Sequence, residues 1–336
     1  MTQNKQRAKR AGWVGAMLSM VAIGLAAVSP AHGAYPDHAV TLVVPFPAGG
    51  PTDQLARSLA EALRKPLGVA VQIEHIGGAG GTVGAAKVAR AAPDGYTLLL
   101  HHIGMATAPA LYPSLAYNTL DDFEYLGLLQ EVPMVLVGRP GLPAKSYAEL
   151  SQWMVANRGK VNLANAGQGS ASQLCGLLFR SVTQMDLRSV RYRGASPAMA
   201  DLLTGQVDLM CNQSTDTVAL LSKNKLRAYA VTSPQRLDVP GLAEVPTLSE
   251  LGLKGFSVTV WHGVYAPHGT PKPVLEALAA ALQQARSDPV FQANATAGGA
   301  SVVQDARSQG PEHKRFVKSE LSKWGAVIRA AGEFAN

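Results

Sequence analysis

The feature that most constrains the fold is a unit that the chain repeats. Each unit has a short apolar run, a loop of glycine, serine and proline, and then a segment with apolar residues at helical spacing. The apolar runs lie at residues 40–46, 69–74, 96–101, 161–164, 189–192, 207–211 and 228–232. Strands that alternate with helices imply βαβ crossovers and a parallel sheet. The sequence therefore predicts an α/β protein.

The same pattern predicts two domains. It restarts after an apolar run at 135–137, and extended crossings between the halves are expected near 133–139 and 257–266. Two helical segments near the C-terminus, 271–285 and 312–330, are expected to return to the first half. We predict one domain from residues 35–135 plus 262–336, and a second from residues 136–261.

The first residues have the layout of a secretory signal peptide, assigned to residues 1–33. A basic start comes first, with Lys5, Arg7, Lys9 and Arg10. An apolar run at 11–28 and small residues at 29–33 follow, so we expect cleavage near Gly33 or Ala34 and a periplasmic protein. The alternative is a retained membrane anchor. The run is short for a span and has no Lys or Arg on its far side, which argues against an anchor.

The charge and the cysteines follow from export. The net charge of +7 includes the four basic residues of the departing segment, and Lys and Arg form no stripe interleaved with aromatics. No nucleic-acid partner is expected, and a mildly basic body suits a small anionic ligand. Cys175 and Cys211 both remain. An oxidising compartment favours a disulfide, worth about 3–4 kcal/mol in the chain-entropy model, and the alternative is two buried thiols.

Three loops of small residues predict a binding site, because ligands of parallel α/β sheets bind beyond the carboxyl ends of the strands. The loops are residues 45–53, 166–173 and 193–196. Ala48 and Gly49 let backbone N–H groups approach a ligand, and Thr52 is a candidate helix cap. Ser170 and Gln173 have the spacing of a capping box. Exposed amides at positive helix ends, on both halves, predict an anion site.

Two enzyme classes are disfavoured. The glycine-rich segment at 78–84 resembles a dinucleotide fingerprint, but the next strand ends in His101 and His102 instead of the acidic residue that holds a ribose. Close helix–sheet packing explains these glycines better. No Gly-x-Ser-x-Gly elbow is present, and no His or Cys spacing fits zinc. We expect no catalytic residue, no cofactor and no metal.

The loops, in this order, resemble the substrate-binding proteins of the tripartite tricarboxylate transporter family, the TctC or Bug receptors. The matching pieces are VVPFPAGGPTD at 43–53, PDGYTL at 93–98, PALY at 109–112, GQVD at 205–208 and AVTS at 230–233. The resemblance implies a two-domain Venus-flytrap architecture, similar to type II periplasmic-binding proteins. It also implies that a small carboxylate binds between the domains, with its carboxylate held largely by main-chain amides.

The resemblance also implies which residues bind the ligand. These are Phe46, Ala48, Gly49, Thr52 and Asp53 on one side, and Gly169, Ser170, Ser172 and Ala195 on the other. The chain departs from the family's usual His at Gln173, its Asp at Asn212 and its Lys at Arg193, which affects ligand identity. Candidate ligands are organic acids, amino acids and aromatic or pyridine carboxylates.

Two residues and two partners stay open at this point. Asp53 either competes with an anion, holds the loop or accepts a donor from the ligand. Trp261 either covers the pocket or packs at the crossover. The expected partners are the membrane subunits of a transporter or a membrane sensor kinase. We expect a monomer.

Overall fold

The computed structural model describes residues 35–331, and residues from His38 onward form one compact unit. The predicted signal peptide, residues 1–33, lies outside the described residues. The strands are β1 (Val40–Val44), β2 (Val71–His75), β3 (Thr97–His102), β4 (Phe123–Gly138), β5 (Asn162–Asn165), β6 (Arg188–Arg191), β7 (Leu209–Gln213), β8 (Arg227–Val231), β9 (Thr259–Pro267) and β10 (Ser301–Val302). The helices are α1 (Pro51–Leu67), α2 (Thr82–Ala89), α3 (Gly104–Leu111), α4 (Tyr147–Ala156), α5 (Ala171–Thr183), α6 (Ala195–Thr204), α7 (Ser214–Leu221), α8 (Lys272–Arg286), α9 (Pro289–Ala297) and α10 (Gly310–Ala331).

The strands form one long sheet in the order β2-β1-β3-β9-β4-β7-β5-β6, with β8 and β10 also paired to β4. The two ends of this sheet are parallel, as the alternating pattern predicts: β1 pairs with β2 and β3, and β5 pairs with β6 and β7. The middle is antiparallel, because β4 and β9 run against their neighbours. A purely parallel sheet is therefore wrong, and the two predicted extended crossings are its antiparallel middle strands.

Strand β4 joins the two ends of the sheet by changing partners. It pairs with β9 as far as Pro133, and from Met134 onward it pairs with β7 and β8. The sequence predicts a strand only at 135–137, because Gly127, Gln130 and Pro133 interrupt its apolar pattern. The strand nevertheless extends from Phe123, since pairing with β9 and burial on both faces hold it extended.

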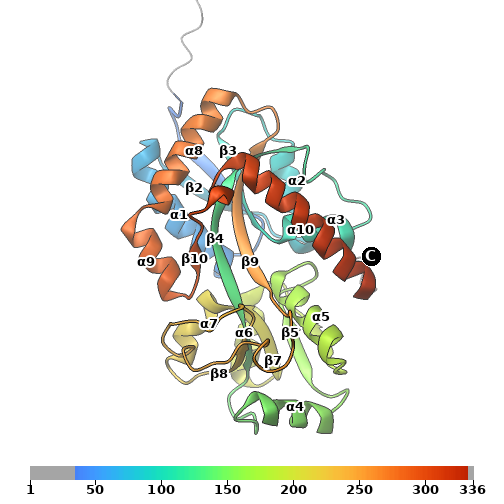
Figure 1. Cartoon of the computed structure of the whole chain (residues 1–336). Coiled ribbons are helices and arrows are strands. Elements are labelled where there is room, and N and C mark those ends of the chain that lie inside the picture. Colours follow the sequence, from blue (N-terminus) through green and yellow to red (C-terminus); the bar gives the residue numbers. More distant parts are fainter. Residues whose placement is uncertain (1–34, 332–336) are drawn as a thin grey trace, which may run out of the picture. The chain divides into compact units, whose positions relative to one another are not determined.

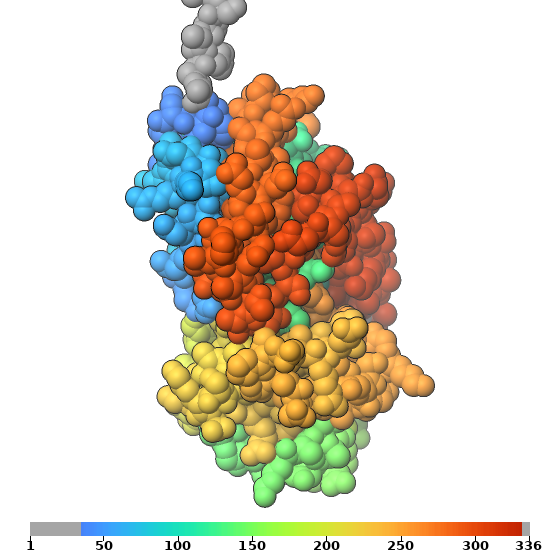
Figure 2. All heavy atoms as spheres, turned by 60° about the vertical axis from the view of Figure 1, so that its left-hand side comes forward, coloured from blue at the N-terminus to red at the C-terminus, as the bar shows by residue number. Residues whose placement is uncertain are grey.

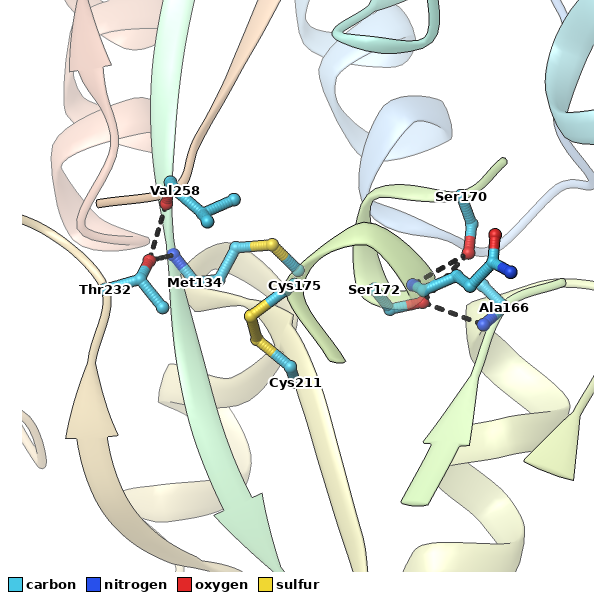
Figure 3. Close-up of a disulfide and its surroundings, with 9 residues drawn as sticks. Met134, Ala166, Ser170, Ser172, Cys175, Cys211, Thr232 and Val258 are labelled. Atoms are coloured by element: carbon cyan, nitrogen blue, oxygen red, sulfur yellow. Dashed lines mark hydrogen bonds between the residues drawn. A yellow bond between two sulfur atoms is a disulfide. The ribbon is translucent and has the colours of Figure 1, made fainter. Parts of the chain in front are cut away.

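Thr232 ties the two crossing segments together at this change of partners. Its buried hydroxyl accepts a hydrogen bond from the Met134 amide at 2.9 Å and donates one to the Val258 carbonyl at 2.6 Å (Figure 3). One side chain thus satisfies a backbone group of β4 and another on the residue just before β9.

Helices from the two ends of the chain cover the first half of the sheet. Helix α8 packs against α1 and β4, and α10 packs against α3 and β4 (Figure 1). Figure 2 shows the blue and orange-red residues side by side, while green and yellow residues form the other part. The predicted return of the two C-terminal helices is confirmed. In the described residues 35–331, no helix is long and apolar enough to cross a bilayer.

The repeated pattern in the sequence did not predict every helix. Helices α3, α4, α7 and α9 were not predicted; α3 contains Pro109 and has little amphipathic contrast. Asp288 caps α9 by accepting hydrogen bonds from the amides of Val290 and Phe291. Helix α6 begins at Ala195 and ends at Thr204, and Gly205 follows it in the left-handed region as its C-cap.

Candidate ligand-binding site

A cavity of about 470 Å³ lies where the loops that follow β1, β5, β6 and β7 meet. The cavity is lined by residues of both halves of the sheet: Phe46, Pro47, Gly50, Pro51, Thr52, His102, Met134, Ala166, Ser170, Ala171, Ser172, Gly194, Ala195, Asn212 and Gln213.

Four helices begin at this cavity. The N-cap residues of α1, α5, α6 and α7 all line it, and they are Gly50, Ser170, Gly194 and Gln213. The first amides of a helix have no intrahelical acceptor, and the helix end carries a partial positive charge. Four such ends around one cavity favour an anion there without any basic side chain.

The start of α1 is held by Asp53. The Asp53 carboxylate accepts hydrogen bonds from the Gly49 amide at 2.9 Å, from His75 Nε2 at 2.7 Å and from Arg57 Nε at 3.1 Å. Burial raises the pKa of Asp53, but the hydrogen bonds from Gly49, His75 and Arg57 outweigh burial and the net pKa is lowered. Asp53 is therefore ionised and holds the loop in place, and its carboxylate is already hydrogen-bonded to three donors.

Thr52 does not cap α1, so that expectation is wrong. The N-cap is Gly50, with no side-chain hydrogen bond, and Pro51 takes the first helical position where its missing N–H costs nothing. Thr52 is the second residue of the helix and is buried. Its hydroxyl lies 3.5 Å from Nε2 of His262.

The start of α5 forms the expected cap. Ser170 Oγ accepts a hydrogen bond from the Gln173 amide at 3.2 Å, and the Gln173 side chain accepts one from the Gly169 amide at 2.6 Å. Ser172 Oγ accepts a hydrogen bond from the Ala166 amide at 2.8 Å and lies 3.1 Å from Ser170 Oγ (Figure 3). The serines therefore brace the loop, and the first helical amides, at 171 and 172, precede the first intrahelical bond.

The cavity carries no formal charge of its own. Its lining includes no Asp, Glu, Lys or Arg. Burial first, and then the neighbouring His101 and His262, hold the pKa of His102 well below its usual range, so His102 is neutral. Attraction for an anion therefore comes from backbone amides and helix ends.

These features match a family of known receptors. The model of the family described as tripartite tricarboxylate transporter family receptor, TctC, matches residues 55–333. The chain belongs to this family. A relative from Agrobacterium vitis, encoded in the TAR-I ttuE-ttuC' intergenic region, is 44% identical over 307 residues, covering 91% of this chain and 88% of the relative.

Two solved structures resemble the receptor over most of its length. The periplasmic binding protein BugD is 45% identical with a TM-score of 0.86, covering 90% of this chain and all (100%) of its own. MatC from Rhodopseudomonas palustris, with bound malate, is 38% identical with a TM-score of 0.83, covering 88% of this chain and 100% of its own. The α/β Venus-flytrap architecture is therefore confirmed, and the family and its structural neighbours are solute-binding receptors, not enzymes.

The receptor brings five of the nine predicted binding residues to the cavity. These are Phe46, Thr52, Ser170, Ser172 and Ala195.

The other four residues lie outside the lining: Ala48, Gly49, Asp53 and Gly169. Gly49 and Gly169 donate their amides to Asp53 and Gln173 and so shape the two loops. Trp261 also lies outside it, buried at the crossover, where its Nε1–H donates to Glu320 at 3.2 Å.

Sequence reasoning missed His102 and Gln213 as lining residues. Each is the last residue of a strand, β3 and β7, where the next segment turns into a helix. Polar residues at strand ends beside the small-residue loops were the available signal.

A larger cavity of about 1150 Å³ adjoins it, and the two linings share Phe46, Pro47, Ala166, Ser170 and Gly194. Arg193 is the one charged residue in the described lining of this larger cavity. Its two sides touch, because Tyr112, the residue that follows α3, donates a hydrogen bond to the Gln168 carbonyl at 3.1 Å. A ligand longer than the first cavity would extend toward Arg193.

A disulfide joins Cys175 and Cys211, whose Cα atoms are 6.1 Å apart (Figure 3). Of the two alternatives, a disulfide or two buried thiols, the structure has the disulfide. Cys175 lies in α5 and Cys211 in β7, so the bond links the elements that carry two of the four helix N-termini. The disulfide therefore connects two elements that lead into the cavity.

The glycine-rich segment packs closely, as expected. A Cβ on Gly84 would lie 2.8 Å from the Ile76 carbonyl oxygen and 2.8 Å from the Pro45 side chain. Among residues 35–331, no group of three or more His, Cys, Asp or Glu side chains could hold a metal ion.

Proposed function

We propose that this chain is an exported periplasmic receptor that captures a small carboxylate in the cavity and delivers it to the membrane subunits of a tripartite tricarboxylate-type transporter. Family membership supports the receptor role. MatC, which was solved with bound malate, supports a carboxylate ligand. Export rests on the basic and apolar pattern of residues 1–33.

One observation carries the proposal: four helix N-termini converge on a cavity whose described lining has no charged side chain. A carboxylate accepts hydrogen bonds only, so it matches the first backbone amides of these helices, which have no intrahelical acceptor. An uncharged sugar would gain little from four positive helix ends, and a cation would be repelled.

The predicted binding residues divide into two proposed roles. We assign direct ligand contact, mostly through backbone amides, to the five that line the cavity. Ala48, Gly49, Asp53 and Gly169 are assigned the task of shaping the loops. The short bonds from Gly49 to Asp53 and from Gly169 to Gln173 support that assignment.

Capture requires two domains that close on the ligand, residues 35–135 plus 262–336 and residues 136–261. The change of partners in β4 after Pro133 supports a hinge at the crossing strands. The loops of both sides already touch at Tyr112 and Gln168, which is the contact a closed cleft makes.

The first experiment is a thermal-shift screen of the chain without residues 1–33 against carboxylates, sugars and nucleotides. A ligand at 100 times its dissociation constant stabilises by about 2.7 kcal/mol, so a carboxylate should raise Tm clearly. Shifts caused only by sugars or nucleotides would contradict the proposal. Uptake of the labelled ligand, which should fail in cells without this chain, separates delivery from signalling to a sensor kinase.

A further inference from the structure

Two polar side chains of the cavity lining offer one hydrogen-bond donor and one hydrogen-bond acceptor, and a carboxylate, which only accepts, can pair with the donor but not with the acceptor. His102 and Gln213 are both more than nine-tenths buried, with exposed fractions of 3% and 5%, and both line the cavity. Buried polar groups in folded proteins are nearly always paired. Side-chain atoms of these two residues that have no partner in the described protein therefore indicate a ligand group that pairs with them.

The tautomer of His102 follows from its backbone partner. Nδ1 of His102 accepts a hydrogen bond from the Gly104 amide at 2.9 Å. A nitrogen that accepts has no proton, so the neutral ring carries its proton on Nε2. In the described residues the hydrogen bond at Nδ1 is the one that the ring forms, so Nε2 is left as an N–H donor on a residue that lines the cavity.

The ring of His102 is also held in place. It stacks on Phe46 with ring centroids 4.4 Å apart, and it meets His262 edge-on at 5.8 Å. Burial and the neighbouring histidines keep it neutral. The Nε2–H donor of His102 is therefore held in position before a ligand binds.

Gln213 supplies the complementary capacity. Its side-chain Oε1 is buried without a hydrogen-bond partner in the described part of the chain. Gln213 is also the N-cap of α7 but forms no side-chain cap. An unpaired buried amide oxygen is costly, so a second residue of the cavity lining has an acceptor without a partner.

A ligand hydroxyl satisfies both side chains at once. A carboxylate oxygen only accepts and an ammonium group only donates, whereas a hydroxyl accepts one hydrogen bond and donates another. We propose that the receptor selects hydroxycarboxylates: the carboxylate binds the helix N-termini, and the hydroxyl accepts from His102 Nε2 and donates to the Gln213 side chain. This inference rests on the carboxylate binding proposed above.

The test compares matched acids by titration calorimetry at pH 7. The pairs differ by one hydroxyl: lactate and propionate, malate and succinate, citrate and tricarballylate. Aspartate tests an ammonium group, and succinamate tests an amide. In the pair that binds, the hydroxy acid should bind at least about tenfold more tightly than its partner, because a site built for a hydroxyl leaves polar groups unpaired without it.

Two variants assign the effect to the named side chains. Gln213→Met and His102→Phe should each bring the ratio of the two dissociation constants toward one. Gln130→Met is the control for the first, since Gln130 is equally buried but lies outside this cavity. His313→Phe is the control for the second, since His313 also accepts a backbone amide, that of Gly127 at 3.2 Å, through Nδ1. Both controls should keep the ratio.

The outcomes separate the two proposals. Equal affinity within the pair, or tighter binding of the deoxy acid, aspartate or succinamate, overturns hydroxyl recognition and leaves carboxylate capture standing. If only carboxylates outside these pairs bind, the conclusion is the same: hydroxyl recognition is overturned and carboxylate capture stands. If no carboxylate binds at all, both proposals fail. A fold defect in His102→Phe leaves the comparison on the unaltered protein and on Gln213→Met to decide.

Discussion

The side-chain amide of Gln54 in α1 donates a hydrogen bond of 2.9 Å to the carboxylate of Asp216 in α7. Asn212 donates a second one to the same carboxylate at 3.1 Å. Both helices begin at the ligand cavity, so this contact links the two halves of the sheet beside the site. A carboxylate in such a place makes the link sensitive to pH.

Asp216 should make the protein less stable as pH rises from about 4 to about 7. Burial raises the pKa of Asp216 to about 6, although hydrogen bonds from Asn212 and Gln54 lower it. Between the ordinary pKa of an aspartate and this raised value, the folded state holds a proton that the unfolded chain has already released, so the free energy of unfolding falls as pH rises from about 4 to about 6 and then levels off.

The check is the unfolding free energy of the natural protein and of Asp216→Asn, measured by urea at pH 4 and pH 7. The difference should move by about 1–2 kcal/mol in favour of the variant as pH rises, after allowance for solvent screening. Asp238→Asn, at an exposed carboxylate, is the control. A difference that does not change with pH would refute the assignment.

The disulfide should contribute strongly to stability. Cys175 and Cys211 are separated by 36 residues, and closing a loop of that length stabilises by about 3–4 kcal/mol in the chain-entropy model. Replacing both with serine should lower the unfolding free energy by that amount. Ligand affinity should also fall, because α5 and β7 carry two of the helix starts.

Reductant provides the control for this prediction. Dithiothreitol should destabilise the natural protein and leave the double serine variant unchanged. A natural protein that is as stable reduced as oxidised would show that the bond contributes nothing.

Thr232→Val should loosen the crossing strands. The variant keeps the shape of the side chain but leaves the Met134 amide and the Val258 carbonyl without their partner, at a cost of about 1–3 kcal/mol. Hydrogen exchange at the Met134 amide should become faster. Thr247→Val is the matched control: Thr247 is also buried, and its hydroxyl accepts from the Glu250 amide away from β4. Unchanged exchange at Met134 would show that Thr232 does not hold the crossing.

Gly80→Ala should weaken ligand binding by keeping the two sides of the cleft apart. A Cβ on Gly80 would lie 2.7 Å from the Gln168 carbonyl oxygen and 2.9 Å from the Tyr112 hydroxyl. If the closed form falls to a tenth of its population, the apparent dissociation constant rises about tenfold.

Backbone strain needs a separate control, because Gly80 has a φ of +64°. Gly141→Ala introduces similar strain at a φ of +73°, with nothing within 4 Å of the new Cβ. Both variants should lose about 1 kcal/mol of stability, but only Gly80→Ala should lose affinity. Equal affinities for the two variants would rule out contact across the cleft.

The order of the elements followed from local pattern. Helix α1 shows how the repeated unit works: Leu55, Leu59 and Leu63 recur at helical spacing in the sequence, and all three are buried. The Ser170–Gln173 cap was foreseen from spacing alone, because a capping box depends on residues three apart. The same local reasoning failed at Thr52, where the helix begins two residues earlier, after Gly50.

The sequence by itself determined the α/β alternation, the small-residue loops at strand ends and the family, since periodicity, capping and motifs depend on near neighbours in the chain. Only the tertiary structure decided that Asp53 holds a loop, that Cys175 bonds to Cys211 and that His102 and Gln213 share one cavity. Each of these facts depends on residues far apart in sequence. The pairing of β4 with β9, β7 and β8 brings them together, and no local pattern encodes that pairing.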